Sequence, residues 1–188
     1  MTSRVSLVAA NNPVRPRRPW TALAALSTLA WALGGCASGP RYEGQVYSGH
    51  GVAFRTGPAP ATWSRLEATG GRLAFRDETN RATILVNGRC GRDADDVPLA
   101  ALTGHLFLRF TERVTDEETL LPFDGREALR TVMTAKLDGV PRRFEALVMK
   151  KDGCVYDLVL IAAPEDFTAA QASFAPFASA FHAGEDVK

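Results

Sequence analysis

The sequence predicts an α+β fold in which a largely antiparallel sheet, in the order βββ-α-ββββ-α, is covered by two helices. Three observations carry this prediction. Short apolar segments separated by turn residues come before a first helical pattern. An Asp-Gly pair then recurs every 14 residues, which is the length of one strand and one hairpin turn. A second helical pattern, rich in phenylalanine, closes the chain.

Three short strands open the predicted sheet. Apolar segments alternate with turn sequences rich in Gly, Asp and Asn, whose residues accept the backbone conformations of tight turns. This order predicts a meander, and residues 52–54 add an edge strand before it. The three meander strands are expected at 62–68, 72–76 and 81–86.

A helical repeat follows the meander. Asp95 or Asp96 can cap the free N–H groups of a helix, and Pro98 fits its first turn. Apolar side chains then recur on one helical face, which predicts a helix over 99–114. The face consists of Leu99, Leu102, Leu106, Phe110 and Val114.

Three Asp-Gly pairs, at 124–125, 138–139 and 152–153, predict three hairpins in succession. Asp-Gly suits the two-residue type I′ turn, in which both residues have positive φ. Apolar and polar residues alternate from Leu129 to Asp138, with the period of a strand. Four antiparallel strands are therefore expected at 117–123, 126–137, 141–150 and 154–162.

The closing helix is expected from Phe167 to Phe181, after a start at Pro164, Glu165 and Asp166. Its aromatic stripe is interpreted as core rather than as a ligand pocket, because each buried phenylalanine stabilises a fold by about 1.5–3 kcal/mol.

Several short motifs of this body resemble PsbP-like α-β-α sandwich domains. The resemblance covers residues 50–182 and implies that fold, whose members are mainly binding and assembly modules. It depends on Pro60-x-x-Trp63, Gly125-x-x-Ala128, the strand Val155-Tyr156-Asp157-Leu158 and the helix from Phe167 to Phe181.

The first 35 residues have the properties of an export signal. Four arginines precede the uncharged run 20–35, which has 16 residues and is short for a membrane span of about 20. The last three residues of this run and the cysteine after them, Leu33-Gly34-Gly35-Cys36, resemble the lipobox of bacterial lipoproteins. That resemblance implies cleavage before Cys36 and lipid on its thiol. An ordinary signal peptide, or a short membrane helix with an incidental cysteine, is the alternative.

The lipoprotein interpretation divides the chain into four parts. Residues 1–35 are the removed signal, 36–49 a flexible spacer, 50–183 a single domain and 184–188 a tail. Several acyl chains would anchor the protein stably to a bilayer that it does not cross. Ala37 is not the aspartate that retains many lipoproteins in the inner membrane, so the resemblance favours the outer membrane.

Two cysteines, Cys90 and Cys154, remain in the exported body and predict one structural disulfide. The alternative is a redox-active pair, but redox sites usually have their thiols close in sequence, as in C-x-x-C.

Composition and motifs exclude several functions. The chain is 46% apolar and 23% charged with a net charge of +1, so it can fold and offers no electrostatic case for binding nucleic acid. No metal or cofactor is expected. The acidic group Asp93, Asp95 and Asp96 lacks the EF-hand order. The three histidines are isolated and are interpreted as solvated: His50, His105 and His182.

The resulting hypothesis is a bacterial envelope lipoprotein, attached to the membrane through Cys36, that faces the periplasm or the cell surface. It would act as a non-catalytic binding or assembly module, with an envelope protein as a possible partner. One alternative is an envelope enzyme whose site is assembled from residues distant in sequence. A purely structural spacer is the other.

Overall fold

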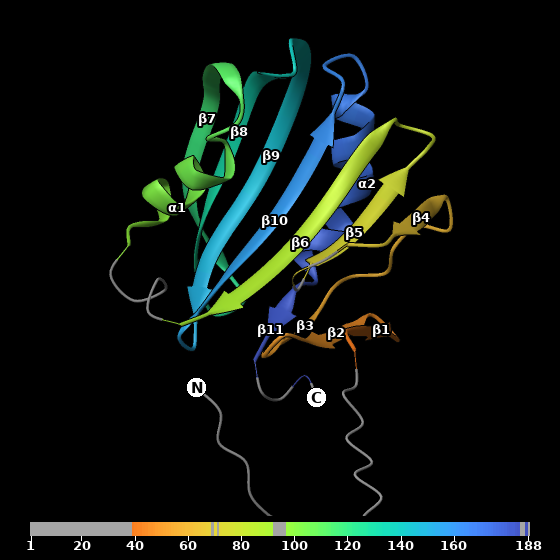
Figure 1. Cartoon of the computed structure of the whole chain (residues 1–188), viewed down its shortest axis with the longest axis vertical. Coiled ribbons are helices and arrows are strands. Elements are labelled where there is room, and N and C mark those ends of the chain that lie inside the picture. Colours follow the sequence, from red (N-terminus) through yellow and green to blue (C-terminus); the bar gives the residue numbers. More distant parts are fainter. Residues whose placement is uncertain (1–38, 69, 71, 92–96, 185–186, 188) are drawn as a thin grey trace, which may run out of the picture. The chain divides into compact units, whose positions relative to one another are not determined.

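The computed structural model describes residues 39–187, except 69, 71, 92–96 and 185–186. Its main feature is a seven-stranded sheet in the order β4-β5-β6-β10-β9-β8-β7, in which every neighbouring pair is antiparallel (Figure 1). The strands are β4 (Trp63–Leu66), β5 (Arg72–Asp77), β6 (Ala82–Cys90), β7 (Thr111–Phe123), β8 (Arg126–Leu137), β9 (Val140–Lys151) and β10 (Cys154–Ala162).

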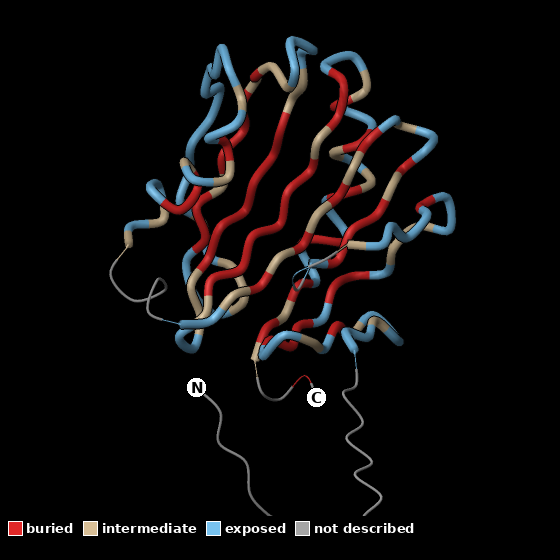
Figure 2. Tube along the Cα trace, viewed as in Figure 1, coloured by how far each residue is buried: buried red, intermediate tan, exposed pale blue. Residues whose placement is uncertain are grey.

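Two helices cover the two faces of this sheet. The short helix α1 (Leu99–Leu106) lies against β8 and β9, and α2 (Phe167–Ser179) packs on the other face against β10, β6 and β9. Figure 2 shows buried residues along the central strands between the helices. The α+β class, the antiparallel sheet and the two covering helices are confirmed.

The three Asp-Gly turns are as expected. Asp124, Asp138 and Asp152 have φ values of 48°, 50° and 52°, and the glycine after each has φ between 71° and 79°. Both residues of each loop therefore have the positive φ of a type I′ turn. The strands that these turns join agree with the predicted ranges to within a residue or two, apart from the beginning of β7.

A second, smaller sheet corrects the prediction for the beginning of the body. It has the order β1-β2-β3-β11, with β1 (Arg41–Glu43), β2 (Val46–Gly49), β3 (Val52–Arg55) and β11 (His182–Ala183). Residues 41–49, expected as spacer, thus form two strands. They fold because Tyr47 is buried and stacks on Phe54, with ring centroids 4.7 Å apart. The strand expected over 52–54 is not an edge, since β3 pairs with both β2 and β11.

The helix expected over 99–114 ends early, at Leu106. Phe107 and Phe110 leave the helix and pack their rings against Phe144, while β7 begins at Thr111 and leaves Val114 exposed. The β-branched residues after Phe110 favour a strand. As a strand, β7 pairs with the 12-residue β8 from Thr111 to Phe123. Pairing with β8 therefore outweighs the helical repeat.

The end of the chain also differs from the prediction. The helix α2 ends at Ser179, and Phe181 follows it into the core, stacked on Phe123. Within 184–188, expected as a tail, Val187 is buried. At Gly57 the chain approaches α2 so closely that an added Cβ would lie 2.4 Å from the carbonyl oxygen of Pro176. Only glycine fits this crossing.

Candidate functional site

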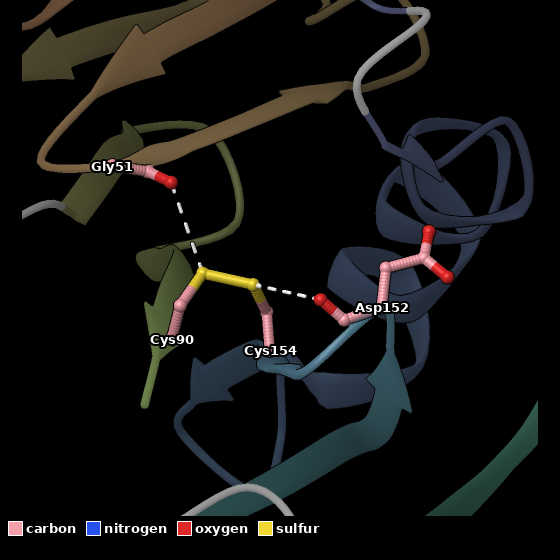
Figure 3. Close-up of a disulfide and its surroundings, with 4 residues drawn as sticks. All are labelled: Gly51, Cys90, Asp152 and Cys154. Carbon is pink, nitrogen blue, oxygen red and sulfur yellow. Dashed lines mark hydrogen bonds between the residues drawn. A yellow bond between two sulfur atoms is a disulfide. The ribbon is translucent and has the colours of Figure 1, made fainter. Parts of the chain in front are cut away.

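Cys90 and Cys154 form a disulfide across β6 and β10, where they face each other in the ladder. Figure 3 shows Cys90 Sγ directed at the carbonyl oxygen of Gly51, in the turn between β2 and β3, at 3.8 Å. The bridge therefore lies where the main sheet meets the small sheet. A disulfide indicates a location outside the reducing cytosol. Cys36, the expected lipidation site, lies outside the described residues.

The histidines do not converge on one site. His50 and His105 are exposed on different elements, whereas His182 pairs with Asp124. Within the described ranges no group of three or more His, Cys, Asp or Glu side chains could hold a metal ion. Asp93, Asp95 and Asp96 lie outside these ranges. In the same part of the chain, no helix is long and apolar enough to cross a bilayer.

A charged network that the sequence did not reveal lies on the α2 face of β8 and β9. Arg130 donates from Nε to Glu145 and from Nη1 to Glu117, both at 2.6 Å. The other oxygen of Glu145 accepts a hydrogen bond from Gln171 of α2 at 2.8 Å. Burial lowers the pKa of Arg130, but the two carboxylates outweigh it and the net pKa is raised. Glu145 is satisfied on both oxygens, so the network is a structural connection to α2.

Beside this network is a cavity of about 340 Å³. Its charged groups are Asp124, Arg130 and Glu145, and each already has partners within the protein. The remaining lining comes from the ends of β7 and β9 and from α2, and is mainly apolar: Leu121, Pro122, Phe123, Leu147, Phe174, Ala175, Ala178 and Ser179.

A larger groove of about 720 Å³ lies where the small sheet meets β4 and β5. Arg65 extends over the ring of Tyr42, with its guanidinium carbon 5.5 Å from the ring centroid. The Tyr42 hydroxyl and Thr56 Oγ1 share a hydrogen bond of 2.8 Å, which fixes the ring beneath the cation. The groove is lined by Pro40, Tyr47, Arg65, Leu66, Glu67, Ala68 and Arg72.

The tyrosine that lines the groove, Tyr47, has a hydroxyl without a partner among the described residues. The residue is 1% exposed, and its oxygen forms no hydrogen bond in the part of the chain that the structure describes. Burial raises the pKa of Tyr47, and the nearby charge of Arg65 lowers it by less. The net pKa lies above the ordinary value of 10.0, so the hydroxyl keeps its proton at neutral pH. The lining of the groove thus includes a buried donor that has no partner among the described residues, near a guanidinium group.

A buried carboxylate lies in the main sheet, apart from the groove. Asp157 on β10 is 1% exposed and accepts hydrogen bonds from Asn87 at 3.1 Å and from Arg89. Burial raises its pKa, although the charge of Arg89 and the two hydrogen bonds lower it. Its other oxygen has no partner among the described residues.

Sequence reasoning missed the groove because its residues come from four separate segments between 40 and 72, which belong to three strands and to the loops beside them. Part of that range was assigned to spacer. The strand β2 has four residues, in which Val46 and Tyr47 come before Ser48 and Gly49, so no apolar-polar alternation marked it in the sequence.

No family model matches the chain, and no curated protein matches its sequence. Solved structures do match it. Cyanobacterial PsbP (CyanoP) from Synechocystis sp. PCC 6803 is 20% identical with a TM-score of 0.55, over 81% of this chain and 99% of that one. LpqN, involved in cell envelope biogenesis of Mycobacterium tuberculosis, is 14% identical with a TM-score of 0.50, over 77% and 88%.

A protein from Bacteroides thetaiotaomicron is 11% identical with a TM-score of 0.52, over 72% of this chain. This chain spans 46% of that protein, which is less than half of its length. Together these likenesses show the fold. The PsbP-like architecture expected from the short motifs is therefore found in the structure.

Proposed function

We propose that the protein is a lipoprotein of the bacterial envelope, anchored through lipid on Cys36, and that its folded part is a non-catalytic binding module. The observation that carries the proposal is the groove beside Pro40. Four residue steps separate Pro40 from Cys36, and a fully extended chain of that length spans at most about 14 Å. A ligand in the groove would therefore lie close to the bilayer surface.

The charges on and beside the small sheet also favour a position of the groove close to the bilayer surface. Arg41 and Arg55 are exposed on it, and Arg65 and Arg72 line the groove next to it. Basic side chains near an anionic membrane surface each add about 1 kcal/mol of attraction. The likeness to LpqN, which is involved in cell envelope biogenesis, supports a role in the envelope. Ala37 favours the outer membrane as the location.

A Cys36→Ser variant tests the anchor. The wild-type protein should incorporate labelled palmitate and fractionate with membranes, whereas Cys36→Ser should carry no label and lose the mobility of the processed, lipidated form. The matched control is the double variant Cys90→Ser/Cys154→Ser, which removes the other two cysteines and should still be labelled. Labelling of Cys36→Ser would contradict the proposal.

Crosslinking in intact cells tests the binding role. The anchored protein should give one reproducible crosslinked neighbour in the envelope, and Cys36→Ser should lose it. Hydrolysis of envelope substrates by the purified protein, at a rate that a single substitution abolishes, would contradict the non-catalytic role.

A further inference from the structure

Arg65 is a cation without a counter-ion in the described structure. Its guanidinium group lies over the face of the Tyr42 ring, and no carboxylate of the described residues forms an ion pair with it. Glu67 lines the same groove and forms no ion pair with any residue that the structure describes. An aromatic ring that lies under a guanidinium group holds the plane of the guanidinium in place and leaves the N–H donors of the guanidinium available. A planar fork of donors in a fixed position suits the oxygens of an anion.

The hydroxyl of Tyr47 is the second donor. A buried polar group without a partner costs free energy, so such a group usually has a ligand, a water molecule or an ion as its partner. Tyr47 is one of the lining residues of the groove, and a Cβ added to Gly49 would lie 3.3 Å from its hydroxyl and 2.8 Å from Pro40. Arg65 is close enough to Tyr47 for the two to interact electrostatically. An anion in the groove would accept hydrogen bonds from both Arg65 and Tyr47.

The size and remaining lining of the groove indicate a ligand larger than a simple ion. Its volume of about 720 Å³ is in the range of small-molecule sites. Pro40, Leu66 and Ala68 add apolar surface, and Arg72 adds a second cation. A molecule with an anionic head and an apolar part matches this combination.

We propose that the groove binds a phosphate-type anion, whose oxygens accept hydrogen bonds from Arg65 and from the Tyr47 hydroxyl. The phosphate of an anionic membrane phospholipid is the source that the apolar lining favours. The choice of source rests on the proposed function, because the anchor at Cys36 would hold the groove at the bilayer. The anion site itself does not depend on the anchor.

The test measures binding by the full chain purified in a nonionic detergent. The probes are mixed micelles that contain phosphatidylglycerol, the same micelles with diacylglycerol, which lacks the phosphate, and inorganic phosphate alone. We expect binding to phosphatidylglycerol and none to diacylglycerol. Arg65→Gln should weaken binding about tenfold or more, the loss expected of a charge-assisted hydrogen bond. Tyr47→Phe should weaken it about threefold to tenfold, as for a neutral hydrogen bond.

The expected stability of Tyr47→Phe and a control for Arg65→Gln separate a loss of binding from a loss of folding or of charge. Tyr47→Phe removes only a hydroxyl that has no hydrogen-bond partner among the described residues, so its melting temperature should equal or exceed that of the wild type. Arg109→Gln is the matched control for Arg65→Gln, because it removes one exposed positive charge after α1, outside the groove lining. Arg109→Gln should leave binding unchanged.

Each result decides the proposal. Inorganic phosphate that binds alone, with the same dependence on Arg65 and Tyr47, supports the anion site with a soluble source. Binding of phosphatidylglycerol without binding of phosphate supports the lipid source. Equal binding of phosphatidylglycerol and diacylglycerol, or equal losses in Arg65→Gln and Arg109→Gln, would overturn it. None of these results depends on palmitate labelling or fractionation, so the proposed function stands or fails separately.

Discussion

The carboxylate of Asp124 joins the first Asp-Gly turn to the last strand, through His182. Its Oδ1 lies 2.5 Å from Nδ1 of His182, and its Oδ2 accepts a hydrogen bond from the backbone N–H of Ala183 at 2.8 Å. Lys151 Nζ contacts the same Oδ2 at 3.0 Å. One side chain, 6% exposed, thus connects the main sheet with the small sheet through the turn and β11.

Replacement of Asp124 by Asn should therefore destabilise the fold. Asparagine keeps the turn, because it accepts positive φ, but it removes the charge and one acceptor. We expect the free energy of unfolding to fall by about 1 to 3 kcal/mol, measured by urea denaturation. Asp138→Asn makes the same change at an exposed turn of the same type and should alter stability by less than about 0.5 kcal/mol. Equal losses in the two variants would contradict this role.

The two glutamates that contact Arg130 should differ in their importance. The side chain of Glu145 is 9% exposed and that of Glu117 is 52% exposed. Glu145→Gln weakens a nearly buried ion pair and should lower the free energy of unfolding by about 2 to 3 kcal/mol. Glu117→Gln weakens a solvent-exposed ion pair and should lower the free energy of unfolding by less than about 1 kcal/mol. Chemical denaturation of both variants checks this order, and a larger loss in Glu117→Gln would refute it.

The sequence identifies local features better than distant contacts. The Asp-Gly turns and the strands between them follow from turn chemistry and a period of two, which neighbouring residues determine. The helix predicted over 99–114 is present from Leu99 to Leu106, but its continuation to Val114 was wrong, because the residues from Thr111 onward pair with β8 instead. The groove could not be predicted, since Tyr47 and Arg65 belong to different sheets and meet only after both sheets have formed.

Reduction of the disulfide should lower stability, although β6 and β10 would still pair. Cys90 and Cys154 are 64 residues apart, and the chain-entropy model gives about 4 kcal/mol for a closed loop of this length. We expect a lower melting temperature in dithiothreitol than in buffer, measured by circular dichroism. The double variant Cys90→Ala/Cys154→Ala should melt near the reduced wild type and should not respond to the reductant. A wild-type melting temperature that the reductant leaves unchanged would show that the bridge adds nothing.

Asp157 should make stability depend on pH. Burial raises its pKa above the ordinary 3.8, so the folded protein holds this proton at a higher pH than the unfolded chain does. The stability that the group contributes is complete below the ordinary pKa and is lost as the pH rises through the raised value. Asp157→Asn removes this dependence.

The free energy of unfolding of the wild type, relative to that of Asp157→Asn, should therefore fall as the pH increases from about 3 towards 7. Urea denaturation of both proteins at a series of pH values measures this difference. Asp138→Asn, the same substitution at an exposed turn, serves as the control for general effects of pH. If the difference stays constant, or rises with pH, the ion pair with Arg89 outweighs the cost of burying the carboxylate, and the assigned direction of the pKa shift is wrong.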